Sequence, residues 1–375
     1  MQSEKEFLQG FEECFGAIKD GRQASKIDHP LIEILFLSVV AVAGGAFSWG
    51  MIEYFGKAHL PILRSYYPFK NGTPSDDTIR RVFEAIDPEN MNGLLQQYFT
   101  KDLNLKGKHV AIDGKTLRGS RYNNTRALHM LNVYASGSGL TLFGKIVEAK
   151  TNEITAIPEA LDLLDLKGST ITIDAMGCQR HIAQKIIDKE ADYILGLKEN
   201  QVALYNEVAK AFSSNADSFF GIEKETSEDK GHGRICYRTC RVMRDLSKLS
   251  LASLWPGAQS VIEIKSETIK KGITTFSTNY YIASSKDDPT IMMKNIRDHW
   301  KIESMHWMLD VVFREDASAM HKGNIPANMA IIRRFILNVL TNMKGKRESR
   351  PQLMKMIGWS PDYLCRFINL LVNRS

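Results

Sequence analysis

Three acidic residues stand in local settings that suit metal-dependent chemistry. Asp113 lies in the apolar run HVAIDGKTLR and Asp174 ends a second such run, STITIDAMG, so both are predicted to lie on strands. Glu303 lies in IRDHWKIESMHWMLDVV, which has the pattern of a helix. Carboxylates held on rigid elements are the ligands that a pair of divalent cations needs for phosphoryl transfer. Singly, each acid would more often be a turn or cap residue; together, they predict a nuclease or a strand-transfer enzyme.

The predicted glutamate helix carries further polar and aromatic side chains near Glu303. Residues three, four and seven positions away share its face. These residues are His299, Trp300, His306, Trp307 and Asp310. Trp can stack on an unstacked base, and His can bind phosphate or shuttle a proton. We expect DNA contacts from the two His and two Trp, although at least one Trp is expected to pack the helix onto the sheet.

Basic and amide side chains follow the predicted strand of Asp113 and a later predicted strand. Lys115 lies two residues after Asp113, so on a strand it faces the same way. Arg118 lies just beyond, and both could hold the scissile DNA backbone. Lys198 and Asn200 close the strand DYILGLKEN, and strand ends of such sheets often line a site.

Two more segments carry candidate DNA contacts. KGHGR places His232 and Arg234 on either side of a Gly, as in a hairpin tip that could approach DNA; a plain surface turn explains the isolated pentapeptide better. Arg80 and Arg81 lie on the predicted helix TPSDDTIRRVFEAID, for which Ser75 is a candidate N-cap. These two Arg could meet phosphates, and a solvated helix face explains them equally well.

The order of predicted elements indicates an α/β fold. Three short strand-like runs follow the helical N-terminal region, and helix and strand then alternate, which is the order of an RNase H-like mixed sheet flanked by helices. A β-rich insertion precedes the helix of Glu303. The predicted domains are a helical N-terminal domain at 1–105, the catalytic core at 106–200 and 289–345, the insertion at 201–288 and a basic helical tail at 346–375.

Composition favours an ordered protein, and the charge distribution allows a polyanionic partner. The chain has 375 residues, of which 43% are hydrophobic and 25% charged, enough for two or three domains. From His321 onward ten Lys/Arg oppose two acids, a net charge of +8, which suits DNA or equally an ordinary solvated face. Five Cys without a CxxC pair fit a reducing cytoplasm. The apolar run from Ile34 to Phe47 is too short to span a bilayer, so no membrane is expected.

Six motifs occur in one order along the chain: AIDGKTLR, NEITAIPEALDLL, TIDAMGCQ, GLKENQ, KGHGR and HWKIESMHWMLDVVFRED. This ordered set resembles the H-repeat-associated (Rhs-associated) insertion-sequence transposases, bacterial DDE transposases with a β-strand insertion. HPLIEILFLSVVAVAGGA and GTPSDDTIRRVF extend the resemblance over nearly the whole chain. The resemblance implies an RNase H-like fold with Asp113, Asp174 and Glu303 as catalytic metal ligands.

The resemblance also implies a function. It predicts cut-and-paste transposition with two Mg²⁺ ions (or Mn²⁺), double-stranded inverted-repeat ends and target DNA as partners, a homodimer at synapsis, and a bacterial cytoplasmic location with nucleoid association when DNA is bound. Related transposases carry a Tyr-Arg-Glu-Lys signature, which here reads Ile296, His299, Glu303 and Asp310. Asp310 is therefore expected to play a supporting role, through a hydrogen bond to His306 or to a basic neighbour.

Two other functions fit the same residues. The first is a domesticated, catalytically idle DNA-binding regulator, which would bind inverted repeats and cut nothing. The second is an RNase H-type nuclease acting on RNA–DNA hybrids, for which the N-terminal helices and the insertion are unnecessary.

Overall fold

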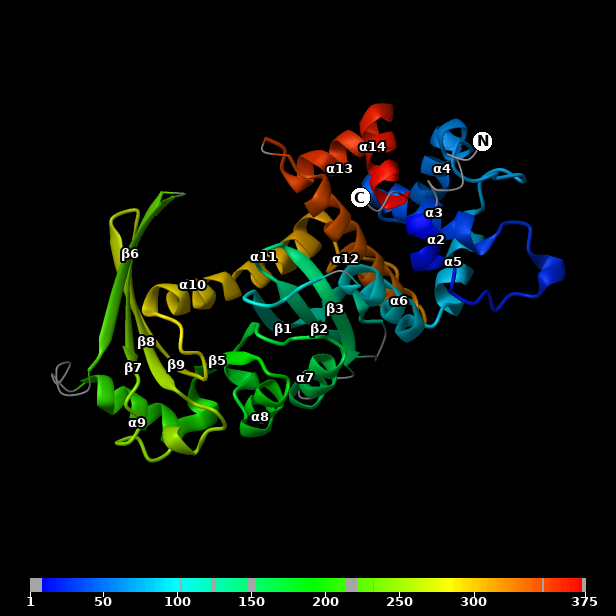
Figure 1. The fold of residues 1–375 in the computed structure, drawn as a ribbon. Helices are drawn as coiled ribbons and strands as arrows, with labels where there is room; N and C mark the ends of the chain where they lie inside the picture. Colours follow the sequence, from blue (N-terminus) through cyan, green and yellow to red (C-terminus); the bar gives the residue numbers. More distant parts are fainter. Residues whose placement is uncertain are drawn as a thin grey trace.

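One mixed sheet runs through the protein, and helices cover it. The computed structural model describes residues 9–101, 103–122, 126–147, 153–213, 221–231, 233–345 and 347–372. Nine strands of this part of the chain form the sheet. In Figure 1 the sheet occupies the middle and left of the molecule, and the N-terminal and C-terminal helices gather together at the other end.

Five strands make the core of the sheet. They are β1 (His109–Leu117), β2 (Leu128–Ala135), β3 (Leu140–Val147), β4 (Thr170–Ile173) and β5 (Asp192–Leu197). β1, β2 and β3 pair antiparallel, whereas β4 pairs parallel with β1 and β5 pairs parallel with β4. The order β3-β2-β1-β4-β5 with these directions confirms the predicted RNase H-like mixed sheet.

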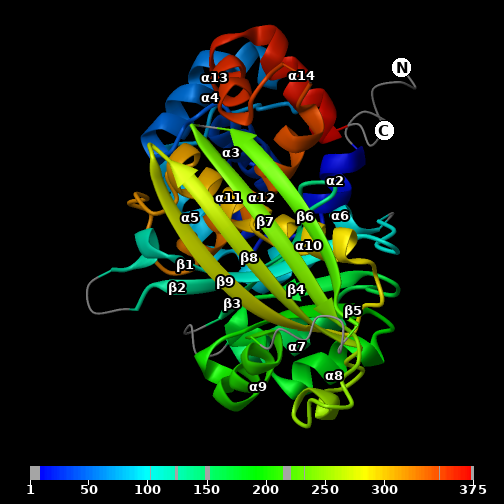
Figure 2. The same cartoon turned by 90° about the vertical axis from the view of Figure 1, so that its left-hand side faces the viewer.

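The predicted β-rich insertion continues this same sheet. Its strands are β6 (Glu223–Gly231), β7 (Arg234–Met243), β8 (Ser260–Lys270) and β9 (Ile273–Ala283), and α9 (Val202–Ser213) precedes them. β9 pairs antiparallel with β5, so the full order ends β5-β9-β8-β7-β6. Figure 2 looks onto these long strands, which lie side by side. The insertion thus forms an extension beside the core strands rather than a separate body.

Helices cover both faces of the core strands. α7 (Glu153–Asp162) and α8 (Arg180–Asp188) lie on one face, and α10 (Pro289–His299) and α11 (Lys301–Trp307) cross the other. Because side chains alternate along a strand, β1 contributes to two cores. Val110 and Ile112 pack in the cluster of α7 and α8, whereas Ala111 packs in the cluster of α11 and the terminal helices. Asp113 has the same parity as Ala111, so it faces α10 and α11.

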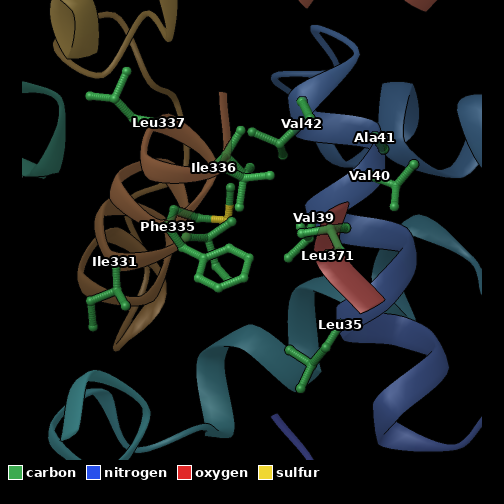
Figure 3. Close-up of a cluster of buried hydrophobic side chains, with 14 of the residues drawn as sticks. Leu35, Val39, Val40, Ala41, Val42, Ile331, Phe335, Ile336, Leu337 and Leu371 are labelled. Atoms are coloured by element: carbon green, nitrogen blue, oxygen red, sulfur yellow. The ribbon is translucent and has the colours of Figure 1, made fainter. Parts of the chain in front are cut away.

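The terminal helices form one bundle. They are α2 (Gln9–Phe15), α3 (Leu31–Ala43), α4 (Trp49–Leu63), α5 (Asp76–Ala85), α6 (Pro88–Thr100), α12 (Ile325–Met343), α13 (Arg350–Trp359) and α14 (Pro361–Val372). Ser75 caps α5 as predicted, since its side chain accepts from the Thr78 amide. Figure 3 shows Leu35 and Val39 of α3 across from Phe335 and Ile336 of α12. α14 packs on α2 and α3, so the C-terminal segment closes the N-terminal bundle.

The apolar run and the basic C-terminal segment are both partly explained by burial in this fold. In the described part of the chain, no helix combines the length and apolar character needed to cross a membrane. The run from Ile34 onward forms most of α3, whose residues are almost all buried. Two of the ten basic residues after His321, Arg333 and Arg334, are also buried, so they do not contribute to a surface for polyanions.

Candidate active site

The three acids predicted to act together line one cleft. Ile112 of β1 pairs with Ile173 of β4, so Asp113 and Asp174 occupy the next matching positions on neighbouring parallel strands. Strands lie about 4.8 Å apart, which places the two side chains side by side. Glu303 on α11 borders the same cleft from above the sheet. Asp174 and Glu303 are open to solvent, whereas Asp113 is deeper.

A tight turn fixes Asp174 at the end of β4. Its Oδ1 accepts from the backbone amides of Met176 (3.0 Å) and Gly177 (3.4 Å) at the start of the 3-10 helix Ala175–Gly177. A Cβ on Gly177 would lie 2.3 Å from the Ile173 side chain, so this turn needs a residue without one. The Asn200 amide donates to the Ala175 carbonyl. Asn200, predicted to contact DNA, thus holds the turn of Asp174.

The acids repel one another in the absence of cations. Burial raises the pKa of Asp113 to about 7, and the negative charges of Asp174 and Glu303 add to this rise. Burial also raises the pKa of Glu303. Among the described residues no Lys or Arg forms an ion pair with any of the three, and His306 Nδ1 lies 3.6 Å from Asp113 Oδ2. This uncompensated carboxylate cluster is the kind of environment that a divalent cation stabilises.

The donor set fits hard cations, but the arrangement is open. Carboxylate oxygens are the ligands that Mg²⁺ prefers. Over the residues that the structure describes, no three His, Cys, Asp or Glu side chains are grouped closely enough to enclose an ion. Mg²⁺ is commonly held by one or two carboxylates together with water and substrate phosphate, so Asp113, Asp174 and Glu303 could hold ions without enclosing them.

Lys115 was expected to hold the DNA backbone, and its position shows that this expectation is wrong. Only 6% of its side chain is exposed, and its Nζ lies 2.6 Å from Asp310 Oδ1. Asp316 (3.3 Å) and Glu315 (3.6 Å) complete its surroundings. Asp310 lies in the π-helical turn Met308–Val312 that ends α11. The basic neighbour expected for Asp310 is thus Lys115, and the pair anchors the end of the glutamate helix to β1.

Replacing Lys115 by Met is expected to lower the free energy of unfolding by about 1–3 kcal/mol, because the partly buried Asp310 loses the partner of its ion pair while Glu315 keeps Arg334. Urea unfolding measures the change. Lys167→Met is the control, since the Lys167–Glu190 pair is exposed and its loss costs less than about 1 kcal/mol. Equal stability of the two variants, with weaker DNA binding by Lys115→Met alone, would return Lys115 to the role of a DNA contact.

The aromatic and imidazole side chains around Glu303 separate into partly buried and exposed groups. The side chain of His306 is 13% exposed and faces Asp113 and Asn132, and its expected contact with DNA stays a prediction. His299 lines the cleft, and its Nδ1 lies 2.9 Å from Thr172 Oγ1. Trp300 and Trp307 are 60% and 54% exposed, so neither packs the helix onto the sheet as expected of at least one.

The helix geometry explains this separation. α10 ends at His299 and α11 begins at Lys301, with Trp300 as the junction at ψ −10°. The regular spacing that the sequence suggests is therefore interrupted on both sides of Glu303, at Trp300 and at the π-helical turn. Side chains that an uninterrupted helix would place on one face point in different directions.

A basic groove continues from the cleft along the β extension. Its cavity of about 470 Å³ lies between α10 and the strands β7, β8 and β9. It shares Trp300 and Ile296 with the acidic cleft. Arg234, which the sequence placed at a hairpin tip, lines it together with Arg238 and Arg297, which sequence reasoning missed. Arg238 could have been found because it lies four residues after Arg234 and therefore faces the same way on a strand.

The other predicted DNA contacts have different surroundings. Lys198 borders the acidic cleft, and the side chain of Arg118 is 82% exposed. Arg80 and Arg81 pair with acids of their own helix, Asp77 and for Arg80 also Glu84, and neither borders the cleft or the groove. His232 lies outside the residues that the structure describes.

Comparison with known proteins shows the family of this chain. The family described as "Transposase DDE domain" matches residues 104–339, more than half of the chain, and the family described as "DDE_Tnp_1-associated" matches residues 12–99. The Escherichia coli O157:H7 protein "Putative transposase YncI" is 37% identical over 365 residues, covering 95% of this chain and 94% of that protein.

Two further similarities differ in weight. The Escherichia coli K12 protein "H repeat-associated putative transposase YhhI" is 34% identical over 369 residues, covering 95% of this chain and 97% of that protein. A structure described as a piggyBac transposase synaptic complex with hairpin DNA has a TM-score of 0.43 at 12% identity over 98% of this chain and 79% of its own, and a likeness of this degree carries no weight here. On its sequence relatives and family match, the chain belongs to the DDE transposase family, among relatives that include an H repeat-associated member.

Proposed function

We propose that this protein binds the inverted-repeat ends of an insertion sequence and catalyses metal-dependent DNA cleavage and strand transfer. The observation that carries the proposal is the meeting of Asp113, Asp174 and Glu303 at one cleft. No Lys or Arg of the described residues neutralises them, and the deepest one has a pKa raised to about 7. A cleft that concentrates negative charge in this way suits cations that bridge it to a phosphate.

The three acids have distinct parts in this proposal. Asp113 and Asp174, on neighbouring strands, and Glu303, on α11, would hold two Mg²⁺ or Mn²⁺ ions. Such ions supply activation of the attacking water or DNA 3′-hydroxyl and stabilisation of the leaving oxygen. The protein positions the phosphodiester between these carboxylates, and the sheet and α11 keep the acids on rigid elements. No covalent enzyme intermediate is required.

The basic groove is the proposed path of one DNA end. Arg234, Arg238 and Arg297 line it, and positive side chains of this kind bind phosphates without reading sequence. Arg238 and Arg297 both pair with the Asp229 carboxylate, so a DNA phosphate would compete with that acid for them. Trp300 stands where the groove meets the acidic cleft. Lys198 follows β5, which lies between the strands of the two aspartates and the groove strands, and it borders the cleft, where it is proposed to contact the DNA strand. Arg118 and Trp307, both exposed, are proposed to touch DNA outside the cleft.

Trp300→Ala is expected to weaken binding of end DNA by roughly 5- to 100-fold, because stacking of one base on an aromatic side chain contributes about 1–3 kcal/mol. Fluorescence anisotropy with a labelled end duplex measures the change. Phe276→Ala is the matched control: its ring is 77% exposed, and it lies on β9 at a position that faces away from the groove. Equal affinities of Trp300→Ala and the unchanged protein would remove Trp300 from the DNA path.

The test of the function uses three substrates with the full-length protein and Mg²⁺. They are a duplex carrying the inverted repeat that flanks the gene, a duplex of scrambled sequence, and an RNA–DNA hybrid. The proposal predicts cleavage at the repeat boundary and joining of the freed 3′ end to target DNA. Binding of the repeat with no cleavage in either Mg²⁺ or Mn²⁺ would instead identify an idle DNA-binding regulator. Cleavage of the hybrid alone would identify an RNase H-type nuclease.

The remaining parts of the proposal follow from the reaction. Two element ends must be joined, so two copies of the chain are proposed to meet at synapsis. The reaction takes place on chromosomal DNA, which puts the protein in the bacterial cytoplasm and on the nucleoid while DNA is bound. Asp310, paired with Lys115, is proposed to support the glutamate helix. Full activity of Asp310→Ala would remove it from the site.

A further inference from the structure

A line of buried and partly buried polar side chains connects the C-terminal helix α12 to Asp113. Arg334 Nε lies 2.7 Å from Asn132 Oδ1. Asn132 Nδ2 lies 3.2 Å from His306 Nε2, and His306 Nδ1 lies 3.6 Å from Asp113 Oδ2. Asn132 is directly opposite Asp113 on β2. The three partners come from β2, α11 and α12, so no local motif of the sequence contains this line.

The donors and acceptors of this line can have only one arrangement. An Arg guanidinium only donates, so the atom of Asn132 that faces Arg334 must be the carbonyl oxygen. The amide nitrogen of Asn132 then faces His306, and it also donates to the Met130 carbonyl at 3.1 Å, which fixes the same orientation independently. An amide nitrogen cannot accept a hydrogen bond, so His306 Nε2 must accept and carries no hydrogen. A neutral imidazole with a bare Nε2 has its hydrogen on Nδ1.

We infer that Arg334 and Asn132 set the tautomer of His306, and that His306 thereby points an Nδ1–H at one oxygen of Asp113 and orients this carboxylate for its metal role. The inference rests on the proposed function for the metal role alone. At 3.6 Å the Nδ1–H attracts Asp113 Oδ2 without a full hydrogen bond, and it leaves Oδ1 available to a cation. His306 is a positioning residue in this arrangement. Such partners of metal ligands fix orientation and tune affinity.

Arg334 is held firmly enough to act as the start of the line. Its Nη1 lies 2.9 Å from Glu315 Oε1 and 2.9 Å from the Ala330 carbonyl. Arg334 and Asn132 are 4% and 0% exposed, so water does not compete for the contact between them. The adjacent Arg333 is also buried, and its Nη2 donates to Ser318 Oγ at 3.2 Å. Its Nη1 lies 4.0 Å from the Glu315 Oε1 that Arg334 contacts more closely, and neither of these contacts involves Asn132. Arg333 therefore offers a matched control for the loss of a buried Arg from α12.

The first test reads the tautomer directly. Full-length protein labelled with ¹⁵N-histidine is observed without metal or DNA, and long-range ¹H–¹⁵N correlation shows which ring nitrogen of each His carries hydrogen. The His306 signals are those that disappear in His306→Asn. The inference expects neutral His306 with hydrogen on Nδ1 alone. Hydrogen on Nε2, or a mixture of tautomers, would overturn it, and this result depends on no variant that must fold.

The second test asks whether Arg334 sets the tautomer. Arg334→Met is expected to leave Asn132 free to turn, so that His306 shows both tautomers. Arg333→Met is expected to keep hydrogen on Nδ1. If Arg334→Met and Arg333→Met give the same His306 spectrum as each other, Arg334 does not set the tautomer. This holds whether that shared spectrum matches the unchanged protein or differs from it. Each spectrum is compared with the thermal midpoint of its variant, so that a change due to unfolding is recognised.

The third test measures Mn²⁺ binding by calorimetry. In His306→Asn the side-chain amide nitrogen can take the place of Nδ1, whereas in His306→Gln it takes the place of Nε2. We expect His306→Gln to bind Mn²⁺ about 10- to 100-fold more weakly and His306→Asn to stay much closer to the unchanged protein. Equal weakening in both would remove the orienting role. Absence of Mn²⁺ binding in the unchanged protein would instead contradict the proposed function, while the tautomer result would stand.

Discussion

Glu303→Gln is expected to abolish Mg²⁺-dependent cleavage of end DNA while leaving the affinity for that DNA nearly unchanged. Gln keeps the size of the side chain and removes its charge, so the cleft loses one of its three anionic ligands. A loss of at least about 10³-fold in single-turnover rate, or about 4 kcal/mol of transition-state stabilisation, is expected for a carboxylate that helps hold the catalytic ions. Phosphate contacts in the basic groove do not involve Glu303, so binding persists.

Two measurements separate this effect from general damage. Single-turnover cleavage gives the rate, and anisotropy with the same duplex gives the affinity. Glu267→Gln is the matched control, because Glu267 lies on β8 in the row of Phe276, facing away from the groove. A Glu303→Gln protein that cleaves at the rate of Glu267→Gln would show that Glu303 is not part of the catalytic centre.

Asp113→Asn is expected to stabilise the metal-free protein at neutral pH while destroying its activity. The folded-state pKa of Asp113 is raised to about 7, by burial first and then by the charge of Asp174. Below the pKa of the unfolded chain, near 4, both states are protonated and the group has no effect on stability. Between about pH 4 and 7 the unfolded chain loses this proton before the folded protein does. The unchanged protein therefore loses about 1.4 kcal/mol of stability for each pH unit across this window.

The difference in stability between Asp113→Asn and the unchanged protein reports the titration of Asp113 alone, because all other titrating groups are present in both proteins. In urea unfolding without metal, the free energy of unfolding of Asp113→Asn relative to that of the unchanged protein should increase by a few kcal/mol between pH 5 and pH 8. Added Mg²⁺ should stabilise the unchanged protein at pH 8 by binding its folded state, and Asp113→Asn much less. Parallel pH profiles, or equal stabilisation of both by Mg²⁺, would mean that Asp113 is not an uncompensated acid awaiting a cation.

The sequence predicted the parts of the site that lie on regular elements. The apolar runs before Asp113 and Asp174 predict buried strands. These strands pair in parallel with Ile112 opposite Ile173, which brings the two acids together. The same periodicity could not show that β9 would pair with β5, because pairing partners far apart in the chain leave no local pattern. The extension and its basic groove therefore follow from tertiary structure.

The surroundings of Lys115 and His306 could not be predicted, for one common physical reason. Strand parity placed Lys115 on the side of Asp113, which is correct, but it could not show that Asp310, Glu315 and Asp316 fold over it. Helical spacing likewise put His306 near Glu303 without showing that α12 would bury Arg334 beneath it. The periodicity of a sequence predicts which face of its helix or strand a side chain lies on. Whether that side chain is exposed depends on which other elements pack against that face.

The central claim is that Asp113, Asp174 and Glu303 act as one catalytic unit. Single-turnover cleavage of end DNA in Mg²⁺ should be compared for Asp113→Asn, Asp174→Asn, Glu303→Gln and the protein with all three changes. Residues that act as a unit have strongly non-additive effects, so each single variant is predicted to lose about as much activity as the triple variant. The claim would be contradicted if the fold-loss in rate of the triple variant equalled the product of the three single losses. Full Mg²⁺-dependent cleavage by any single variant would also contradict it.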